Sequence, residues 1–235
     1  MESFTAEGSL SEQGPGPVRS RDEELVRYVG RHGLVAMRHV MDALDVGRTA
    51  AYRRVASCVE AGLLERIDLL RSEAGLLRAS RDGLRFAGLG LSLASVSPGT
   101  VEHYLRCATV ARLAERRYGM DRVLSEREFR LAEQIEGRRI AAAELDERHG
   151  KARLHRADLA IRTEDGTIAV EVELTPKAPW RLKRLIEAWR WATVGGELSE
   201  VHYLCAPGQT RRSVERAMEG SRLSERIVVA EVPVR

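Results

Sequence analysis

The sequence predicts a protein that mixes α-helices and β-strands in two domains, with an N-terminal winged helix-turn-helix followed by an α/β domain. Its length of 235 residues exceeds the ~100–150 residues of a usual single domain. Apolar spacing over residues 21–88 predicts three helices and then two short strands, whereas residues 101–235 mix further helices and strands. A composition of 43% apolar and 31% charged residues is typical of a globular protein.

Composition argues against several classes of protein. No segment approaches the ~20 consecutive apolar residues of a transmembrane helix, and the N-terminus lacks the pattern of a secretory signal. We therefore expect no membrane partner. The cysteines Cys58, Cys107 and Cys205 form no CxxC pair, which predicts reduced thiols in a cytoplasmic protein and argues against a structural zinc site. The net charge of +3 is by itself too small to indicate a nucleic-acid partner.

The N-terminal domain is assigned to residues 21–88, after a flexible tail at residues 1–20 that is rich in Ser, Gly, Glu and Pro. Its first helix begins at Arg21 and ends at Gly33. The remaining predicted elements are helices at Val35–Leu44 and Thr49–Glu60, strands at 63–70 and 76–80, and one helical turn at Arg81–Ala87. Three helices followed by a hairpin form the winged helix-turn-helix, whose third helix enters the major groove of DNA.

The predicted third helix carries a basic face suited to double-stranded DNA. No acidic residue occurs along it before Glu60, so nothing on the helix would repel phosphate groups. The candidate DNA contacts are Arg48, Thr49, Tyr52, Arg53 and Arg54. Two other interpretations fit the same pattern: a three-helix bundle whose basic face is solvated, or a winged helix that binds another protein.

Residues 89–100 contain Gly, Ser and Pro and are the predicted linker to a second domain at 101–235. We predict a helix at Val101–Tyr118, a short strand at Arg122–Ser125 and a polar, irregular or partly helical stretch at Leu131–Arg153. The later elements are strands at Ala157–Thr163 and Ile168–Thr175, a helix at Trp180–Ala192, a strand at Val201–Ala206, a helix at Thr210–Met218 and a strand at Ile227–Val232. The predicted order is αβββαβ, followed by one further helix and strand.

Three carboxylates gather on one face of the hairpin predicted within residues 157–175. Asp165-Gly166 is a strong two-residue turn signal. A turn at these residues places Asp158 opposite Glu173 and Ala160 opposite Glu171. Because strand side chains alternate, all three carboxylates project from the same face, and the apolar residues of both strands form the other, buried face.

Like charges across a strand pair are destabilising, so this face needs a compensating positive charge. A divalent cation is one answer, since the carboxylate oxygens of Asp158, Glu171 and Glu173 suit Mg²⁺ or Mn²⁺. Salt bridges to Arg156 and Arg162, which share the parity of Asp158, are the alternative. A solvated acidic face is the simplest interpretation.

Asp158 followed by Glu171 and Glu173 on the next strand, within an αβββαβ order, resembles the PD-(D/E)XK nuclease superfamily, which has the restriction-endonuclease-like fold. A winged helix followed by HRADLAI and IAVEVELTPK is, more narrowly, similar to the replication-relaxation proteins of bacterial plasmids and integrative elements. The resemblance spans about residues 20–205. It implies a DNA-associated protein of a mobile element, in which a nuclease-type domain follows a DNA-reading head.

The resemblance also implies roles for particular residues. Asp158 matches the metal-binding Asp and Glu171 the following acidic ligand, while Glu173 stands where the superfamily has Lys. Lys177 could substitute for that Lys, and either Lys177 or Glu173 would position or deprotonate the attacking water. Ala157 replaces the motif's Pro, and the candidates for a further acidic ligand are Glu126 and Glu102.

Two functions from different classes follow. The first is a DNA-binding protein with a Mg²⁺-dependent endonuclease-like domain, in which Arg181, Lys183 and Arg184 hold the DNA backbone unless they form a solvated helix face. The second is a non-catalytic transcriptional or transfer regulator whose C-terminal domain contacts a relaxase, a replication protein or a second copy of the chain. The helix at Val101–Tyr118 is the candidate dimer face. A pure interaction module is a third interpretation.

Overall fold

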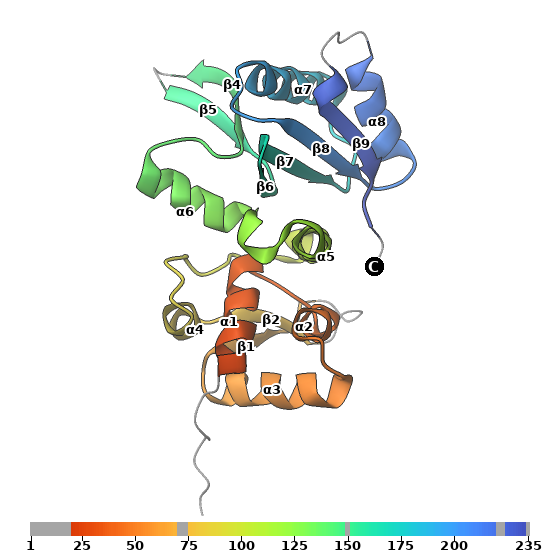
Figure 1. Cartoon of the computed structure of the whole chain (residues 1–235). Helices are drawn as coiled ribbons and strands as arrows, with labels where there is room; N and C mark the ends of the chain where they lie inside the picture. The colour runs from red at the N-terminus through yellow and green to blue at the C-terminus, as the bar shows by residue number, and fades with distance from the viewer. Residues whose placement is uncertain (1–19, 70–74, 149–150, 220–223, 234–235) are drawn as a thin grey trace, which may run out of the picture.

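The computed structural model describes residues 20–69, 75–148, 151–219 and 224–233 (Figure 1). The tail predicted at residues 1–20 lies outside these ranges except for its last residue. The described chain mixes helices with a five-stranded sheet and two separate two-stranded hairpins. Over these residues, no helix combines the length and the apolar character needed to cross a bilayer.

The N-terminal unit consists of three helices, a hairpin and a short fourth helix, as predicted. Its elements are α1 (Ser20–His32), α2 (Met37–Leu44), α3 (Arg48–Glu60), β1 (Leu64–Ile67), β2 (Leu76–Ala79) and α4 (Arg81–Phe86). The strands β1 and β2 are antiparallel. Helical spacing of apolar residues explains the packing, because Leu25, Val29 and Val55 are fully buried in one core that also contains Leu64 and Leu77.

Helix α5 (Pro98–Tyr118) lies between this unit and the sheet (Figure 1). Near its N-terminus, Val101 and Leu105 share a core with Leu34 of the N-terminal unit. Farther along, Ala111 shares a second core with Leu159 of the sheet. The chain itself thus covers the helix from two sides, and the dimer face expected on this helix stays a prediction that would use the exposed remainder of its surface, such as Leu113.

A buried arginine joins the N-terminal unit to the rest of the chain. The Arg31 Nη1 group donates to Glu115 Oε1 of α5 at 3.0 Å, and its Nε group donates to Glu128 Oε1 at 2.6 Å. The remaining Nη2 group donates to the carbonyl oxygen of Val123 at 2.6 Å. The two parts of the chain that the predicted linker at 89–100 connects are therefore in direct contact.

The sheet has the strand order β3-β6-β7-β8-β9. The pairs β3–β6 and β6–β7 are antiparallel, whereas β7–β8 and β8–β9 are parallel. The C-terminal elements are β3 (Val123–Ser125), α6 (Glu126–Glu136), β4 (Ala142–Arg148), β5 (Lys151–Arg156), β6 (Leu159–Thr163), β7 (Gly166–Glu173), α7 (Pro179–Val194), β8 (Glu200–Cys205), α8 (Gln209–Met218) and β9 (Ile227–Glu231). Short 3₁₀ turns at Met120–Arg122 and Ser224–Arg226 precede β3 and β9. Helix α5 covers one face of the sheet, and α7 and α8 cover the other (Figure 1).

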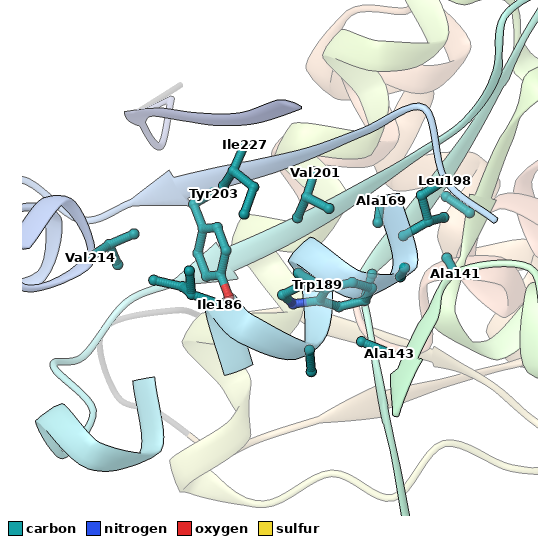
Figure 2. Close-up of a cluster of buried hydrophobic side chains, with 14 of the residues drawn as sticks. Ala141, Ala143, Ala169, Ile186, Trp189, Leu198, Val201, Tyr203, Val214 and Ile227 are labelled. Carbon is teal, nitrogen blue, oxygen red and sulfur yellow. The ribbon is translucent and has the colours of Figure 1, made fainter. Parts of the chain in front are cut away.

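Figure 2 shows the core between the sheet and α7. Trp189 of α7 is fully buried and lies among the small side chains of Ala141, Ala143 and Ala169, with Tyr203 of β8 nearby. Small residues on the strands leave room for the indole, so the helix can pack closely on the sheet. This packing sets the distance between α7 and the sheet face that bears Glu171.

Two predictions for this domain were wrong. The stretch at Leu131–Arg153 is helical in its first part, which belongs to α6, and this helix begins at a capping box between Ser125 and Glu128 and ends at Gly137 in a left-handed conformation. The rest of the stretch is not irregular, because β4 and β5 form a hairpin. The order of elements therefore contains an additional helix and an additional hairpin compared with αβββαβ.

The register of the β6–β7 hairpin also differs from the prediction. The turn is formed by Glu164-Asp165, so Thr163 pairs with Gly166 and Ala160 pairs with Ala169 rather than with Glu171. Gly166 uses its positive φ of 128° at the first paired position rather than inside the turn. The shift is two residues, and an even shift leaves the side chains within β6 and β7 on their predicted faces.

Candidate functional site

The candidate site lies where β6 begins and β7 ends, and Asp158 is at its centre. Asp158 immediately precedes β6, and its Oδ2 atom accepts a hydrogen bond from the backbone N–H of Val172 at 2.7 Å. The Asp158 carboxylate thus accepts a hydrogen bond from β7 just beyond the last residue pair of the β6–β7 ladder, where a backbone carbonyl would otherwise accept it. Its other oxygen, Oδ1, lies 2.8 Å from Nε2 of His103.

Helix α5 contributes two side chains to the site, one turn apart. His103 faces Asp158, and the Cys107 Sγ atom lies 3.5 Å from the same His103 Nε2 atom. The hydrogen bond to Asp158 raises the pKa of His103 above its usual value. Burial raises the pKa of the Cys107 thiol well above its usual value. The donor atoms of these three side chains all lie within 4.8 Å of one another.

Glu171 is 5% exposed and is paired with a histidine from a different strand. Its Oε1 atom lies 2.8 Å from Nε2 of His155 on β5, and the edge of the His155 ring packs against Trp189. Burial raises the pKa of Glu171, against the opposing effect of His155. Burial alone would lower the pKa of His155, but the hydrogen bond to Glu171 and the charge of that carboxylate together outweigh burial, and the pKa is raised.

Glu173, two residues farther along β7, is equally buried and forms an ion pair with Lys177. Burial lowers the pKa of the Lys177 amine, although the charges of Glu171 and Asp158 act in the opposite direction. The chain leaves β7 after Glu173, and the intervening turn brings Lys177 back over the end of the strand.

The structure places all four predicted chemical residues at one end of the β6–β7 pair: Asp158, Glu171, Glu173 and Lys177. Among the described residues, the carboxylates of Asp158, Glu171 and Glu173 are not a group of three whose oxygens lie within 4.8 Å of one another. The structure neutralises them differently from the salt-bridge alternative, because the positive partners are two histidines and one lysine rather than arginines. Arg156 instead pairs with Glu133 at 2.8 Å, and Arg162 is exposed. The two glutamates are buried, so the interpretation as a solvated acidic face was wrong for them.

The candidates for a further acidic ligand lie beside the site rather than in it. The backbone N–H of Glu126 donates to the carbonyl oxygen of Asp158 at 2.9 Å, while its side chain pairs with Arg130. Glu102 is exposed on α5. Ala157, which stands where the motif has Pro, is fully buried in the core.

A basic pocket of about 370 Å³ opens between the β4–β5 hairpin and α7. It has His155 in its wall, so it adjoins the partner of Glu171. Its other lining residues are Leu145, Arg153, Leu154, Trp180, Arg181, Arg184 and Leu185. Trp180 is 69% exposed, and Arg184 forms an ion pair with Asp146 at 2.6 Å. Two of the three helix residues predicted to hold DNA line this pocket, and the third, Lys183, is exposed.

The predicted DNA contacts on α3 fall into two groups. Arg48, Thr49, Tyr52 and Arg53 are exposed, and the guanidinium of Arg48 lies 5.5 Å from the Tyr52 ring centroid. Arg54 is half-buried, and its Nη1 group donates to Asp22 Oδ1 of α1 at 2.6 Å. Arg54 therefore holds α3 against α1.

Three residues of the site were not predicted to have this role: His103, Cys107 and His155. The sequence places His103 and Cys107 four residues apart within the predicted helix at 101–118, which puts both on one face. That spacing was the available signal. His155 lies on β5, a strand that the sequence did not predict.

Comparison with known proteins does not identify the chain. No family model, no curated protein and no solved structure matches it.

Proposed function

We propose that this chain is a DNA-binding protein whose N-terminal unit reads duplex DNA as a winged helix and whose C-terminal sheet hydrolyses a phosphodiester bond with the help of Mg²⁺ or Mn²⁺. The order of the two units is that of the replication-relaxation proteins that the sequence resembles. A protein of a plasmid or another mobile element, with relaxase or replication proteins as partners, is the corresponding biological setting.

One observation carries the proposal: a basic, aromatic pocket and a buried carboxylate cluster meet at His155. Arginines bind phosphate groups, and an exposed tryptophan offers a face on which a base can stack. Phosphate groups held by Arg181 and Arg184 would therefore lie next to the carboxylates of the site. A nucleic acid is the ligand class that uses both features together.

The donor chemistry of the site fits a hard divalent cation. Asp158 and Glu171 supply carboxylate oxygens from neighbouring strands, and Mg²⁺ commonly takes one or two carboxylates together with waters and substrate phosphates. Bound there, such an ion supplies a polarised water and charge neutralisation at phosphorus. The Val172 N–H holds Asp158, and His155 holds Glu171, so both carboxylates are oriented before any ligand arrives.

Lys177 and Glu173 are the residues assigned to the proton transfer. Lys177 is partly buried, and its lowered pKa makes the amine a better proton acceptor than an exposed lysine. Glu173 pairs with Lys177 and holds the amine over the end of β7. In this arrangement the Lys177 amine positions the attacking water. Lys177 thereby takes the role of the motif lysine, whose place in the sequence is occupied by Glu173.

The test is cleavage of labelled single-stranded and duplex DNA by the full chain with and without Mg²⁺. We expect Mg²⁺-dependent cleavage that falls to background in Glu171→Gln, and weaker DNA binding in Arg181→Ala. Arg162→Ala, an exposed arginine of β6 outside the pocket, is the matched control and should behave as wild type. Cleavage that survives in Glu171→Gln would contradict the catalytic assignment.

DNA reading by α3 is tested separately through the salt dependence of binding. Removing one phosphate contact lowers the slope of log affinity against log salt by about 1. We expect that change for Arg53→Ala and a smaller one for Arg54→Ala, because the Arg54 side chain is engaged with Asp22. Equal slopes in wild type and Arg53→Ala would contradict this orientation of the helix.

A second function is favoured by a different observation. Asp158, Glu171 and Glu173 each have a basic partner within the chain, so the cluster can persist without an ion, as expected of a non-catalytic regulator. Duplex binding without cleavage under every Mg²⁺ and Mn²⁺ condition would select this regulator over the nuclease. Absence of binding to any DNA would leave only an interaction module.

A further inference from the structure

A second set of donor atoms shares Asp158 but differs in chemistry from the oxygen pair of the proposed hydrolytic site. It consists of the imidazole of His103, the thiol of Cys107 and the carboxylate of Asp158. The first two come from successive turns of α5, and the third comes from the strand region that α5 covers. Within the described ranges, this is the one group of three such side chains whose donor atoms lie within 4.8 Å of one another.

The spacing of these atoms is close to that of a tetrahedral zinc site. Zinc bonds of ~2.3 Å to sulfur and ~2.05 Å to nitrogen, opened to a tetrahedral angle, place the two ligand atoms about 3.6 Å apart. The Cys107 Sγ to His103 Nε2 distance is 3.5 Å. The same construction requires about 3.4 Å between nitrogen and carboxylate oxygen, whereas His103 Nε2 and Asp158 Oδ1 are 2.8 Å apart. These two atoms would separate by a few tenths of an ångström as the ion replaced the proton between them.

The surroundings suit a site with one open position. Asp158 is anchored through its other oxygen by the Val172 N–H, so the Oδ1 atom remains directed at His103. The His103 side chain is 43% exposed, so the group is not sealed from solvent. Three protein ligands and one position for water are the pattern of reactive rather than structural zinc sites.

We propose that His103, Cys107 and Asp158 bind one Zn²⁺ ion, with water or a ligand from solution in the fourth position. The thiolate and imidazole select zinc over magnesium, because soft ligands disfavour a hard cation. Binding releases the thiol proton of Cys107. The zinc site does not depend on the proposed cleavage of DNA, but zinc at Asp158 would deprive the hydrolytic pair of one carboxylate.

The test uses Co²⁺ as a spectroscopic substitute for Zn²⁺ in the purified full chain, without DNA. We expect one equivalent of Co²⁺ to give a thiolate-to-metal charge-transfer band that Zn²⁺ abolishes by displacement. Cys107→Ser should lose the band, whereas Cys58→Ser and Cys205→Ser should keep it, since both are buried in other cores. A band that survives in Cys107→Ser, or no band in wild type, would overturn the proposal.

A second measurement separates loss of ligand from loss of fold. Zinc affinity is determined by competition with a chromophoric chelator for wild type, His103→Gln and His202→Gln, after circular dichroism has confirmed that each is folded. His103→Gln should weaken zinc binding by at least about tenfold, the smallest loss usual even for groups that only support a metal ligand. His202→Gln should match wild type, because His202 pairs with Glu200 on β8 and is not among the three donors. Equal affinities for all three proteins would show adventitious zinc binding and overturn the assignment.

Discussion

Two clusters of buried charge lie near opposite ends of helix α5. Near its C-terminal end, Arg31 pairs with Glu115 and Glu128 and also donates to a backbone carbonyl. Near its N-terminal end, His103 pairs with Asp158, and the neighbouring Glu171 pairs with His155. Both clusters bury carboxylates, but one uses a guanidinium that is always charged and the other uses imidazoles that can release a proton.

The difference separates a structural joint from a site that can change state. If a glutamate is removed from the first cluster, the buried guanidinium stays charged and loses its partner. If Glu171 is removed, His155 can become neutral and remain buried at little cost. Because an imidazole can lose its proton, it can also exchange a hydrogen bond for a bond to a metal ion. The Arg31 guanidinium of the first cluster cannot do this.

The largest expected effect is on stability, from Arg31→Ala. This change leaves the buried Glu115 and the partly buried Glu128 without their main partner, and breaking a buried pair typically costs about 3–5 kcal/mol in the free energy of unfolding. Urea denaturation measures it. Arg27→Ala, which breaks an exposed pair with Glu23 on the same helix, is the control and should change stability by less than about 0.5 kcal/mol. Similar losses of unfolding free energy in Arg31→Ala and Arg27→Ala would mean that the buried Arg31 cluster stabilises the fold no more than an exposed ion pair does.

The next prediction compares two buried glutamates directly. Glu115→Gln should lower the free energy of unfolding by about 2 kcal/mol, because Arg31 stays charged in a buried position. Glu171→Gln should change it by less than about 1 kcal/mol, because His155 can lose its proton and still hydrogen-bond to the amide. Chemical denaturation of the two variants gives the difference, and equal losses would break the comparison.

The third prediction concerns His32, which lies beside Arg31. Burial, assisted by the Arg31 charge, lowers the pKa of His32 to about 3, so the folded chain keeps this imidazole neutral. The charged and titratable groups around it are Arg31, Arg112, Arg127, His39 and Glu115. The unfolded chain binds the proton below pH ~6.5, so the stability due to neutral His32 is present above that pH and declines as the pH falls toward 3.

Denaturation as a function of pH measures this effect of His32. The loss attributable to one proton is at most about 1.4 kcal/mol per pH unit. In His32→Gln the acid-side loss should become smaller by that contribution. A variant with the same acid-side slope as wild type would mean that His32 is not responsible.

The smallest expected effect comes from a pair of intermediate burial. Arg54→Ala breaks the half-buried contact with Asp22 between α3 and α1, and should cost about 1 kcal/mol of unfolding free energy. Arg53→Ala, one residue away and exposed, should cost almost nothing. Thermal melts of both variants test the ranking, and a larger loss for Arg53→Ala would reverse it.

The sequence predicted the elements of the N-terminal unit well, because its helices are short and two of them, α1 and α3, are followed by Gly33 and Gly62. The shared face of Glu171 and Glu173 was also predictable, since alternation along a strand does not depend on the exact turn. Asp158 precedes β6, and its side chain instead bonds the Val172 N–H and His103 of α5. The register was not predictable, because a glycine can serve either inside the turn or just after it. The β4–β5 hairpin was missed because its sequence is polar and lacks a clear strand alternation.

The partners of the carboxylates could not be read from local pattern. His103 lies 55 residues from Asp158 in the chain, and His155 lies 16 residues from Glu171 on another hairpin. Their pairing depends on how α5 and β5 pack against the sheet, which is a tertiary property. Arg156 and Arg162 are near the carboxylates in the sequence, but in the folded chain Arg156 pairs with Glu133 and Arg162 is exposed.

Helix α5 imposes a constraint on how the length of this chain can vary. His103 and Glu115 are twelve residues apart on one helix, and at ~100° per residue they point about 120° away from each other. One therefore faces Asp158 while the other faces Arg31. Inserting or deleting a single residue between them would rotate one end by about 100° relative to the other. Insertions should therefore be tolerated on either side of this segment and excluded within it.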